Sequence, residues 1–269
     1  HKGSASGVLN GVTYSGSTLD LSTTTAVPGD VALCTASVTD TQGATDSGST
    51  TVSIDNRAPS MTSVTITPNV NVTTQTSVSC AGVASDLDGE VPSIDYVWEV
   101  SGQTIGTGAT LDLQNVSIVP NDVLECVATA TDASGASDVM SSSVTIDNTQ
   151  PIIDSLTISP VSPSGSETIT CAASASDVDG GTPTLSFVFQ ELGTGVLFTS
   201  TSTTNSSATL DLSALTVNTG SEIECVVTAT DVHGGSVTDS TFVTLANSVP
   251  TLSAVTISPS GSVYTGDSL

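Results

Sequence analysis

The sequence Asp55-Asn56-Arg57-Ala58-Pro59 recurs as Asp147-Asn148-Thr149-Gln150-Pro151 and, in weakened form, as Ala246-Asn247-Ser248-Val249-Pro250. Nine residues after the proline of each copy, a second proline closes a Thr-Ile-x-Pro stretch typical of a strand end, at Pro68, Pro160 and Pro259. Self-similarity at a regular period is the sequence signature of a repeat architecture. The chain is therefore a tandem array that these junctions divide into units.

The junctions predict four segments. These are the C-terminal part of a repeat at 1–56, complete repeats at 57–148 and 149–247, and the first strand of a further repeat at 248–269. The segment at 149–247 is the longer of the two complete repeats because of a central insertion at 193–207. That insertion is interpreted either as a tolerated surface hairpin or as the place where one repeat has been specialised.

The cysteines follow the same period. Cys80 pairs with Cys126 and Cys171 with Cys225, at separations of 46 and 54 residues. Cys34 lies 92 residues before Cys126, so we expect its disulfide partner to lie outside the chain. Regular cysteine pairs indicate an oxidising compartment, which predicts an extracellular or cell-surface location. The sequence is thus expected to be a window on a longer repetitive polypeptide.

The charge balance excludes several partners. The formal net charge is −25, and Lys2 and Arg57 are the only Lys or Arg residues. Nothing neutralises phosphates, so nucleic-acid binding is excluded, and an anionic membrane surface is disfavoured. No run is apolar enough to predict direct membrane insertion in this segment. Ser and Thr supply most of the polarity, and candidate glycosylation acceptors of the Asn-x-Ser/Thr type are Asn71, Asn115 and Asn205.

The strand pattern is clearest at 124–131, where Leu124, Cys126, Ala128 and Ala130 alternate with polar residues and Val127. This period of two predicts a strand with one face inward. The strands of this repeat are expected at 63–67, 77–85, 94–100, 110–113, 123–131 and 140–146. Short strands at regular spacing, without helical periodicity, predict a β-sandwich.

An aromatic residue stands 18 positions after the first cysteine of each complete repeat, Trp98 in one and Phe189 in the other. This Cys-aromatic-Cys order resembles the immunoglobulin-like sandwich, although Leu124 and Ile223 stand where that family has a corner tyrosine. Together with the Asp-x-Asp-Gly, Ala-Thr-Asp-x-x-Gly and Asp-Asn-x-x-Pro motifs, it resembles the PKD-like, cadherin-like and bacterial Ig-like repeats of giant extracellular surface proteins. The resemblance implies an all-β tandem array of Ig-like Greek-key sandwiches, each with one inter-sheet disulfide.

Acidic residues recur in three places per repeat: the linker, the loop after the second strand and the loop after the penultimate strand. Sandwich topology returns both loops to the pole where the chain enters, so the three groups should meet at the junction. Carboxylate and amide oxygens without cations nearby are ligands that Ca²⁺ prefers. The predicted ligands are Asp55, Asn56, Asp86, Asp88, Asp132 and Asp138 at one junction, and Asp147, Asn148, Asp177, Asp179, Asp231 and Asp239 at the next.

The alternative interpretation of these motifs is that Asp-x-Asp-Gly forms Asx-turns and solvated loops without a metal. An EF-hand is excluded because Val97 and Val188 stand where its bidentate glutamate would be. Zinc is disfavoured because the cysteines lack short Cys-x-x-Cys spacing.

No enzyme is expected. The two histidines, His1 and His233, lie in different repeats without repeated neighbours, so they offer no triad. Paired carboxylates that recur in every repeat are atypical of a glycosidase.

Three functions remain. The first is a structural rod, stalk or filament segment, with calcium stiffening its junctions. The second is an adhesin or carbohydrate-binding region, with glycans as partners and Tyr14, Tyr96, Trp98 and Tyr264 as its few aromatic candidates. The third is a filament subunit joined head to tail by strand donation. The expected partners are accordingly neighbouring repeats of the same polypeptide or other copies of the chain.

Overall fold

The computed structural model of the chain describes residues 2–203, 206–258 and 260–268. It divides into two compact units, His1–Asp147 and Asn148–Leu269. Among the described residues the regular structure consists of β-strands and three short 3₁₀ helices, and no helix is long and apolar enough to cross a membrane. The all-β prediction is confirmed.

The first unit begins with a single antiparallel sheet in the order β2-β1-β3-β4. We call it the first sheet; its elements are β1 (Lys2–Leu9), β2 (Val12–Ser15), η1 (Leu21–Thr23), β3 (Val31–Thr39) and β4 (Thr45–Ser53).

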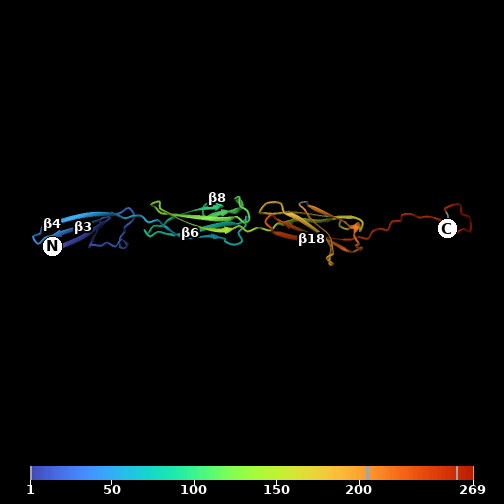
Figure 1. Ribbon diagram of the computed structural model, residues 1–269, viewed down its shortest axis with the longest axis horizontal. Coiled ribbons are helices and arrows are strands. Elements are labelled where there is room, and N and C mark those ends of the chain that lie inside the picture. Colours follow the sequence, from blue (N-terminus) through green and yellow to red (C-terminus); the bar gives the residue numbers. More distant parts are fainter. Residues whose placement is uncertain (1, 204–205, 259, 269) are drawn as a thin grey trace. The chain divides into compact units, whose positions relative to one another are not determined.

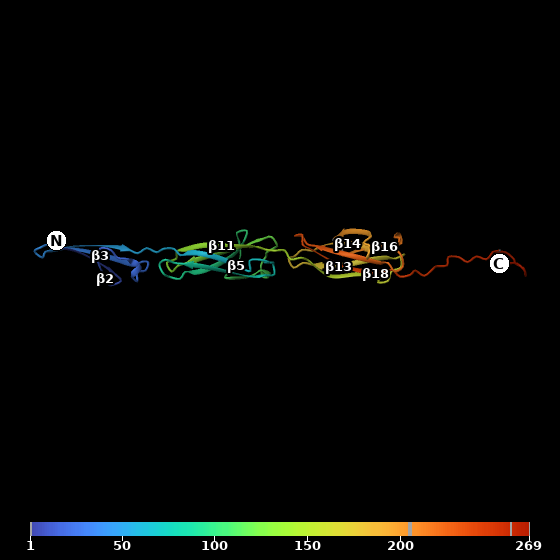
Figure 2. The ribbon, with the colours of Figure 1, turned by 90° about the horizontal axis from the view of Figure 1, so that it is seen from below.

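A complete sandwich follows, the middle sandwich, with a sheet β5-β6-β9 facing a sheet β11-β10-β7-β8. The two layers are visible in green in Figure 1 and, turned by a quarter, in Figure 2. Its elements are β5 (Ser60–Thr67), β6 (Ser77–Ser85), β7 (Ser93–Val100), β8 (Gln103–Thr107), β9 (Thr110–Asp112), η2 (Leu113–Asn115), β10 (Val123–Thr131) and β11 (Ser137–Thr145).

The second unit repeats this plan in the last sandwich, with a sheet β12-β13-β16 and a sheet β15-β14-β17-β18. Its elements are β12 (Ile152–Ser159), β13 (Thr168–Ser176), β14 (Thr184–Glu191), β15 (Leu197–Thr203), β16 (Ser207–Asp211), η3 (Leu212–Ala214), β17 (Glu222–Thr230) and β18 (Ser236–Thr244).

Alternation along the penultimate strand builds each core. Leu124, Cys126, Ala128 and Ala130 of β10 are fully buried, as are Ile223, Cys225, Val227 and Ala229 of β17. Apolar burial of this kind is the main favourable term in folding. The inward face predicted for residues 124–131 is therefore confirmed, and the last sandwich has the same alternation.

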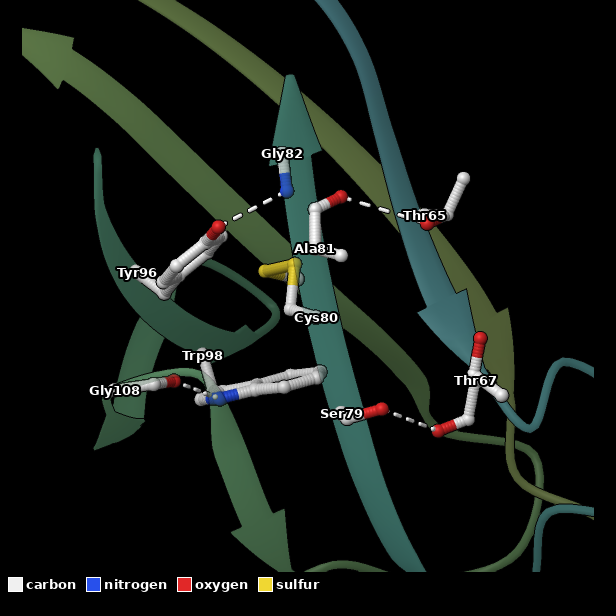
Figure 3. The surroundings of a disulfide bond; sticks show 10 residues. Thr65, Thr67, Ser79, Cys80, Ala81, Gly82, Tyr96, Trp98 and Gly108 are labelled. Carbon is white, nitrogen blue, oxygen red and sulfur yellow. Dashed lines mark hydrogen bonds between the residues drawn. A yellow bond between two sulfur atoms is a disulfide. The ribbon is translucent and has the colours of Figure 1, made fainter. Parts of the chain in front are cut away.

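One disulfide crosses each core between the two sheets. Cys80 of β6 is bonded to Cys126 of β10, and Cys171 of β13 to Cys225 of β17. Trp98 is fully buried beside the first disulfide, and its indole N–H donates a 2.8 Å hydrogen bond to the Gly108 carbonyl (Figure 3). The chain is a tandem array of Ig-like Greek-key sandwiches, each complete one with one inter-sheet disulfide.

A motif that sequence analysis did not single out, Thr-Leu-Asp-Leu, introduces each 3₁₀ helix. Asp20, Asp112 and Asp211 are the N-caps of η1, η2 and η3, and each carboxylate accepts a hydrogen bond from the backbone N–H two residues later. An aspartate at this position satisfies a backbone donor that the helix leaves without a partner. The sequence similarity among the repeats thus includes the segment before the penultimate strand, which is β3, β10 or β17.

Two parts of the described chain lack the rest of a sandwich. Cys34 of β3 is exposed and forms no disulfide with any described residue, at the position that Cys126 holds in β10. Residues 250–258 form no strand, and Leu252, Val255 and Ile257 are exposed. These three stand where Met61, Val64 and Ile66 pack in the middle sandwich.

Candidate cation site at the linkers

The linkers are attached to the sandwich that follows each of them. The Asn56 side-chain amide donates a 2.9 Å hydrogen bond to Oδ2 of Asp132, at the end of β10. Asn148 repeats this bond to Oδ2 of Asp231, at the end of β17, also at 2.9 Å. Topology therefore brings the linker and the loop after the penultimate strand together, as predicted from the sandwich.

The linker backbone makes a second attachment, to the loop after the second strand. The Arg57 N–H donates to Oδ2 of Asp88 at 2.7 Å, and the Thr149 N–H donates to Oδ2 of Asp179. The Arg57 guanidinium also lies 3.4 Å from Oδ1 of Asp88, but its side chain is 65% exposed, so this ion pair contributes little. The backbone bond is the feature that both linkers share.

Asp132 and Asp231 each hold a tight turn as well as a linker. Oδ1 of Asp132 accepts hydrogen bonds from the N–H groups of Ser134 and Ala136, and the residue is only 7% exposed. The Asn56 hydrogen bond, helped by these backbone bonds, holds the pKa of Asp132 below its ordinary value although burial opposes it.

The last sandwich repeats this turn. Burial raises the pKa of Asp231, but hydrogen bonds from Asn148, His233 and Gly235 outweigh it and keep the pKa low. Both aspartates are therefore held as carboxylates.

The Asp-x-Asp-Gly loops form Asx-turns. Oδ1 of Asp86 accepts the Asp88 N–H at 2.7 Å, and Oδ1 of Asp177 accepts the Asp179 N–H at the same distance. Gly89 has a φ of 93°, which only glycine adopts readily and which completes the turn. The Asx-turn interpretation accounts for one carboxylate oxygen of Asp86 and of Asp177, but leaves the other without a role.

Among the described residues, four buried side-chain oxygens have no hydrogen-bond partner, and they occupy equivalent positions in the two sandwiches. They are Asn56 Oδ1, Asp86 Oδ2, Asn148 Oδ1 and Asp177 Oδ2. A buried oxygen without a partner costs about 1–3 kcal/mol, and more when it is charged. The same pair of atoms is therefore available to a ligand in both sandwiches.

In the middle sandwich the oxygens converge. One carboxylate oxygen from each of Asp86, Glu90 and Asp132 lies within 4.8 Å of the other two. Two ligands at about 2.4 Å from a Ca²⁺ ion are at most about 4.8 Å apart, so this separation suits the ion. The Asn56 side chain adjoins this group, because its amide nitrogen is bonded to Asp132. These residues fit a hard cation.

Glu90 was not among the predicted ligands. It directly follows the Asp-x-Asp-Gly motif, which is the signal that could have identified it, but Gly181 stands at the equivalent place in the next repeat. A search for positions that recur in both repeats therefore passes over it.

Four further predicted ligands are exposed or are bonded to other backbone groups. Asp55 and Asp147 are exposed. Oδ2 of Asp138 accepts the Met61 N–H at 2.8 Å, while Asp239 is exposed and accepts the Ser240 N–H. Asp138 and Asp239 are not at equivalent positions. Asp138 is paired with Ala130, whereas Asp239 is paired with Val227, which lies two residues before the counterpart of Ala130.

The other candidate residues have local roles. His233 is an exposed residue of the turn that Asp231 closes. Tyr96 and Trp98 bond to backbone groups within the middle sandwich, and Phe198 of the insertion packs against the core of the last sandwich. Tyr14 is half-buried and Tyr264 is exposed, as are Asn71 and Asn115, whereas Asn205 lies outside the described residues.

No protein-family model and no curated protein matches the chain. Among solved structures, it is similar to one from a study of host cell surface retention of a 1.5-MDa bacterial ice-binding adhesin, with 18% identity, a TM-score of 0.35, and coverage of 91% of this chain and 86% of that chain. It is also similar to a Ca²⁺-stabilized adhesin of an Antarctic bacterium, with 17% identity, a TM-score of 0.33, and coverage of 93% of this chain and 66% of that chain. A third similar structure is that of the fibronectin(III)-like modules of Clostridium thermocellum CbhA, with 18% identity, a TM-score of 0.29, and coverage of 68% of this chain and 94% of that chain. Similarity at this level assigns neither a family nor a function to the chain.

Proposed function

We propose that the chain is a non-enzymatic structural segment of an extracellular surface protein, in which disulfide-crosslinked sandwiches form a rod or stalk and Ca²⁺ stiffens the linkers. The observation that carries the proposal is the repeated attachment of each linker, by Asn to Asp, beside buried oxygens that have no partner. A spacer needs its flexible points restrained, and these contacts restrain them.

Calcium is the preferred ion because the candidate ligands are carboxylate and amide oxygens. Asp86, Glu90, Asp132 and Asn56 would hold it in the middle sandwich, and Asp177, Asp231 and Asn148 in the last one. The ion would neutralise clustered carboxylates and join the linker to two loops. Residues Asp55, Asp138, Asp147 and Asp239 take no part in this arrangement.

The test is thermal unfolding of the chelator-treated chain, followed by circular dichroism with and without millimolar Ca²⁺. Binding to the folded state alone raises stability by about 2.7 kcal/mol when the ion is at 100 times its Kd. A higher melting temperature with Ca²⁺, lost in the Asp86→Asn and Asp177→Asn double variant, supports the proposal. If Ca²⁺ leaves the melting temperature unchanged, the part of the proposal that concerns calcium is wrong.

Stiffness is tested separately, by small-angle X-ray scattering. With Ca²⁺ the maximum dimension of the chain should rise and its scattering should become that of a less flexible particle. If Ca²⁺ raises the melting temperature without altering the scattering, the ion stabilises individual sandwiches and does not stiffen the linkers.

Strand donation is a second candidate, favoured by the exposure of Leu252, Val255 and Ile257, whose counterparts Met61 and Ile66 are buried in the middle sandwich. In this arrangement residues 250–258 would cover the first sheet of another copy. Sedimentation of the chain should then show concentration-dependent association, abolished by Leu252→Ser with Ile257→Ser. A monomer at all concentrations excludes it.

The glycan-binding alternative gains no comparable support. Sugar recognition commonly uses exposed aromatic faces, but Trp98 is fully buried and the Tyr96 hydroxyl is bonded inside the middle sandwich.

A further inference from the structure

The two linker sites differ at one position. Asp86, Asp132 and Asn56 correspond to Asp177, Asp231 and Asn148, but Glu90 corresponds to Gly181. The middle sandwich therefore gathers three carboxylates, whereas the last sandwich offers two at the equivalent positions.

Glu90 is held toward the site by its own contact. Its Oε1 accepts a 3.3 Å hydrogen bond from the Ala133 N–H, which belongs to the turn that Asp132 closes. Three carboxylates within 4.8 Å of one another repel each other unless a cation lies among them. The chain's one arginine lies on Asp88, so no basic side chain is bonded to this cluster among the described residues.

The last sandwich cannot reproduce this arrangement. Gly181 has a φ of +86°, a conformation that side-chain-bearing residues rarely adopt, and a Cβ placed there would lie 3.8 Å from the Val232 side chain. The side chain nearest to that position is the apolar Val232, and residue 181 supplies no carboxylate. The unpartnered oxygens Asn148 Oδ1 and Asp177 Oδ2 still point to a ligand, but with less negative charge around it.

We infer that the two sites bind Ca²⁺ with unequal affinity, the middle sandwich first, so that the two linkers are fixed at different calcium concentrations. This inference rests on the proposed calcium binding and adds the order in which the two sites bind the ion. Ligand charge count is a main determinant of calcium affinity. One additional carboxylate in contact with a divalent ion is expected to lower the Kd by about tenfold or more.

The test is calorimetric titration of the chelator-treated full chain with CaCl₂, with tryptophan fluorescence as a site-specific reporter. Trp98 is the only tryptophan of the chain, so its unfolding transition reports the middle sandwich alone. Two binding events are expected, and the tighter one should coincide with stabilisation of the Trp98 transition. Glu90→Gln should weaken the tighter event by about tenfold and leave the other unchanged.

Asp95→Asn is the matched control, because Asp95 is an exposed carboxylate of β7 in the same sandwich. It should leave both events unchanged. Two events of equal affinity, or a Glu90→Gln variant that binds like the parent, overturn the inferred order while calcium binding stands. No heat of binding and no stabilisation of either sandwich overturn the order and the calcium proposal together.

Discussion

The side-chain amide of Asn148 donates a 2.9 Å hydrogen bond to Oδ2 of Asp231, 83 residues later in the sequence, and Asn56 makes the same bond to Asp132. Each bond closes a sandwich onto the linker that leads into it. Since the two carboxylates are more than nine-tenths buried, they depend on this donor. The asparagine of the linker is thus a structural residue whether or not a metal is bound.

Replacement of Asn148 by alanine should destabilise the last sandwich. The change removes the donor to a buried carboxylate, which is expected to cost about 1–3 kcal/mol. Urea denaturation in the presence of a chelator, followed by circular dichroism, measures the loss. The Trp98 fluorescence transition should not move, because it reports the other sandwich.

Asn115→Ala is the control for this variant. Asn115 is exposed and donates to Asp112 on the surface, so its loss should fall within about 0.5 kcal/mol. Equal effects of the two substitutions would contradict the role assigned to the linker asparagine.

Repetition and alternation predicted most of the fold, because both are local properties of the sequence. Strands β6 and β10 have the predicted bounds, and the inward face of β10 is buried as expected. Strand β8 was not predicted, since Gln103–Thr107 contains Gly106 and does not alternate. That strand forms because β7 offers it an unpaired edge, which is a property of the sheet.

The candidate site was partly accessible to the same reasoning. Topology predicted that the linker and two acidic loops meet, and Asn56, Asp86 and Asp132 do. It did not separate Asp55 from Asn56, because only the backbone conformation decides which neighbouring side chain faces the sandwich. The partners of Asp138 and the approach of Glu90 likewise depend on side-chain geometry.

Stability should fall in acid because of Asp132 and Asp231. The pKa of each is held below its ordinary value, Asp132 by the Asn56 hydrogen bond first, and Asp231 by hydrogen bonds that outweigh its burial. A folded-state pKa below the unfolded value of about 3.9 adds stability that is complete above that pH and is lost as the pH falls through the folded pKa. Melting temperatures between neutral pH and pH of about 2, measured with a chelator, follow this loss.

The Asp132→Asn and Asp231→Asn double variant should start from a lower melting temperature and show a shallower decline below pH of about 4. Asp95→Asn should keep the full slope. A slope unchanged by the double variant would assign the acid sensitivity to the other low-pKa carboxylates, which are Asp20, Asp30, Glu167 and Asp211.

Tyr96→Phe should destabilise the middle sandwich by about 1 kcal/mol. The Tyr96 hydroxyl accepts a 3.0 Å hydrogen bond from the Gly82 N–H across the sandwich (Figure 3). In the last sandwich Phe187 stands at the equivalent position, and the Ala173 N–H bonds to the Ser206 carbonyl instead. The tyrosine thus compensates for the shorter β9, and Trp98 fluorescence in urea measures its removal.

Phe187→Tyr is the reciprocal variant. It should destabilise the last sandwich, because Phe187 is fully buried and the new hydroxyl finds the Ala173 N–H already bonded. If this substitution stabilised the last sandwich, the Ser206 carbonyl would not be the replacement for the tyrosine hydroxyl as acceptor of this backbone N–H.

Removal of the Cys80–Cys126 disulfide should be the most damaging of these changes. The bond closes a loop of 46 residues, and the chain-entropy model assigns about 4 kcal/mol to a loop of this size. Only 3% of the residues are aromatic, and the inward face of β10 carries Ala128 and Ala130, so the core has little apolar volume to replace the crosslink. A domain of this kind is stable by about 5–15 kcal/mol in total.

The Cys80→Ala and Cys126→Ala double variant should therefore unfold at a much lower urea concentration, as measured by Trp98 fluorescence. The Cys34→Ser variant, which removes an exposed thiol, should not shift the transition. A double variant as stable as the parent would mean that the core alone supports the sandwich.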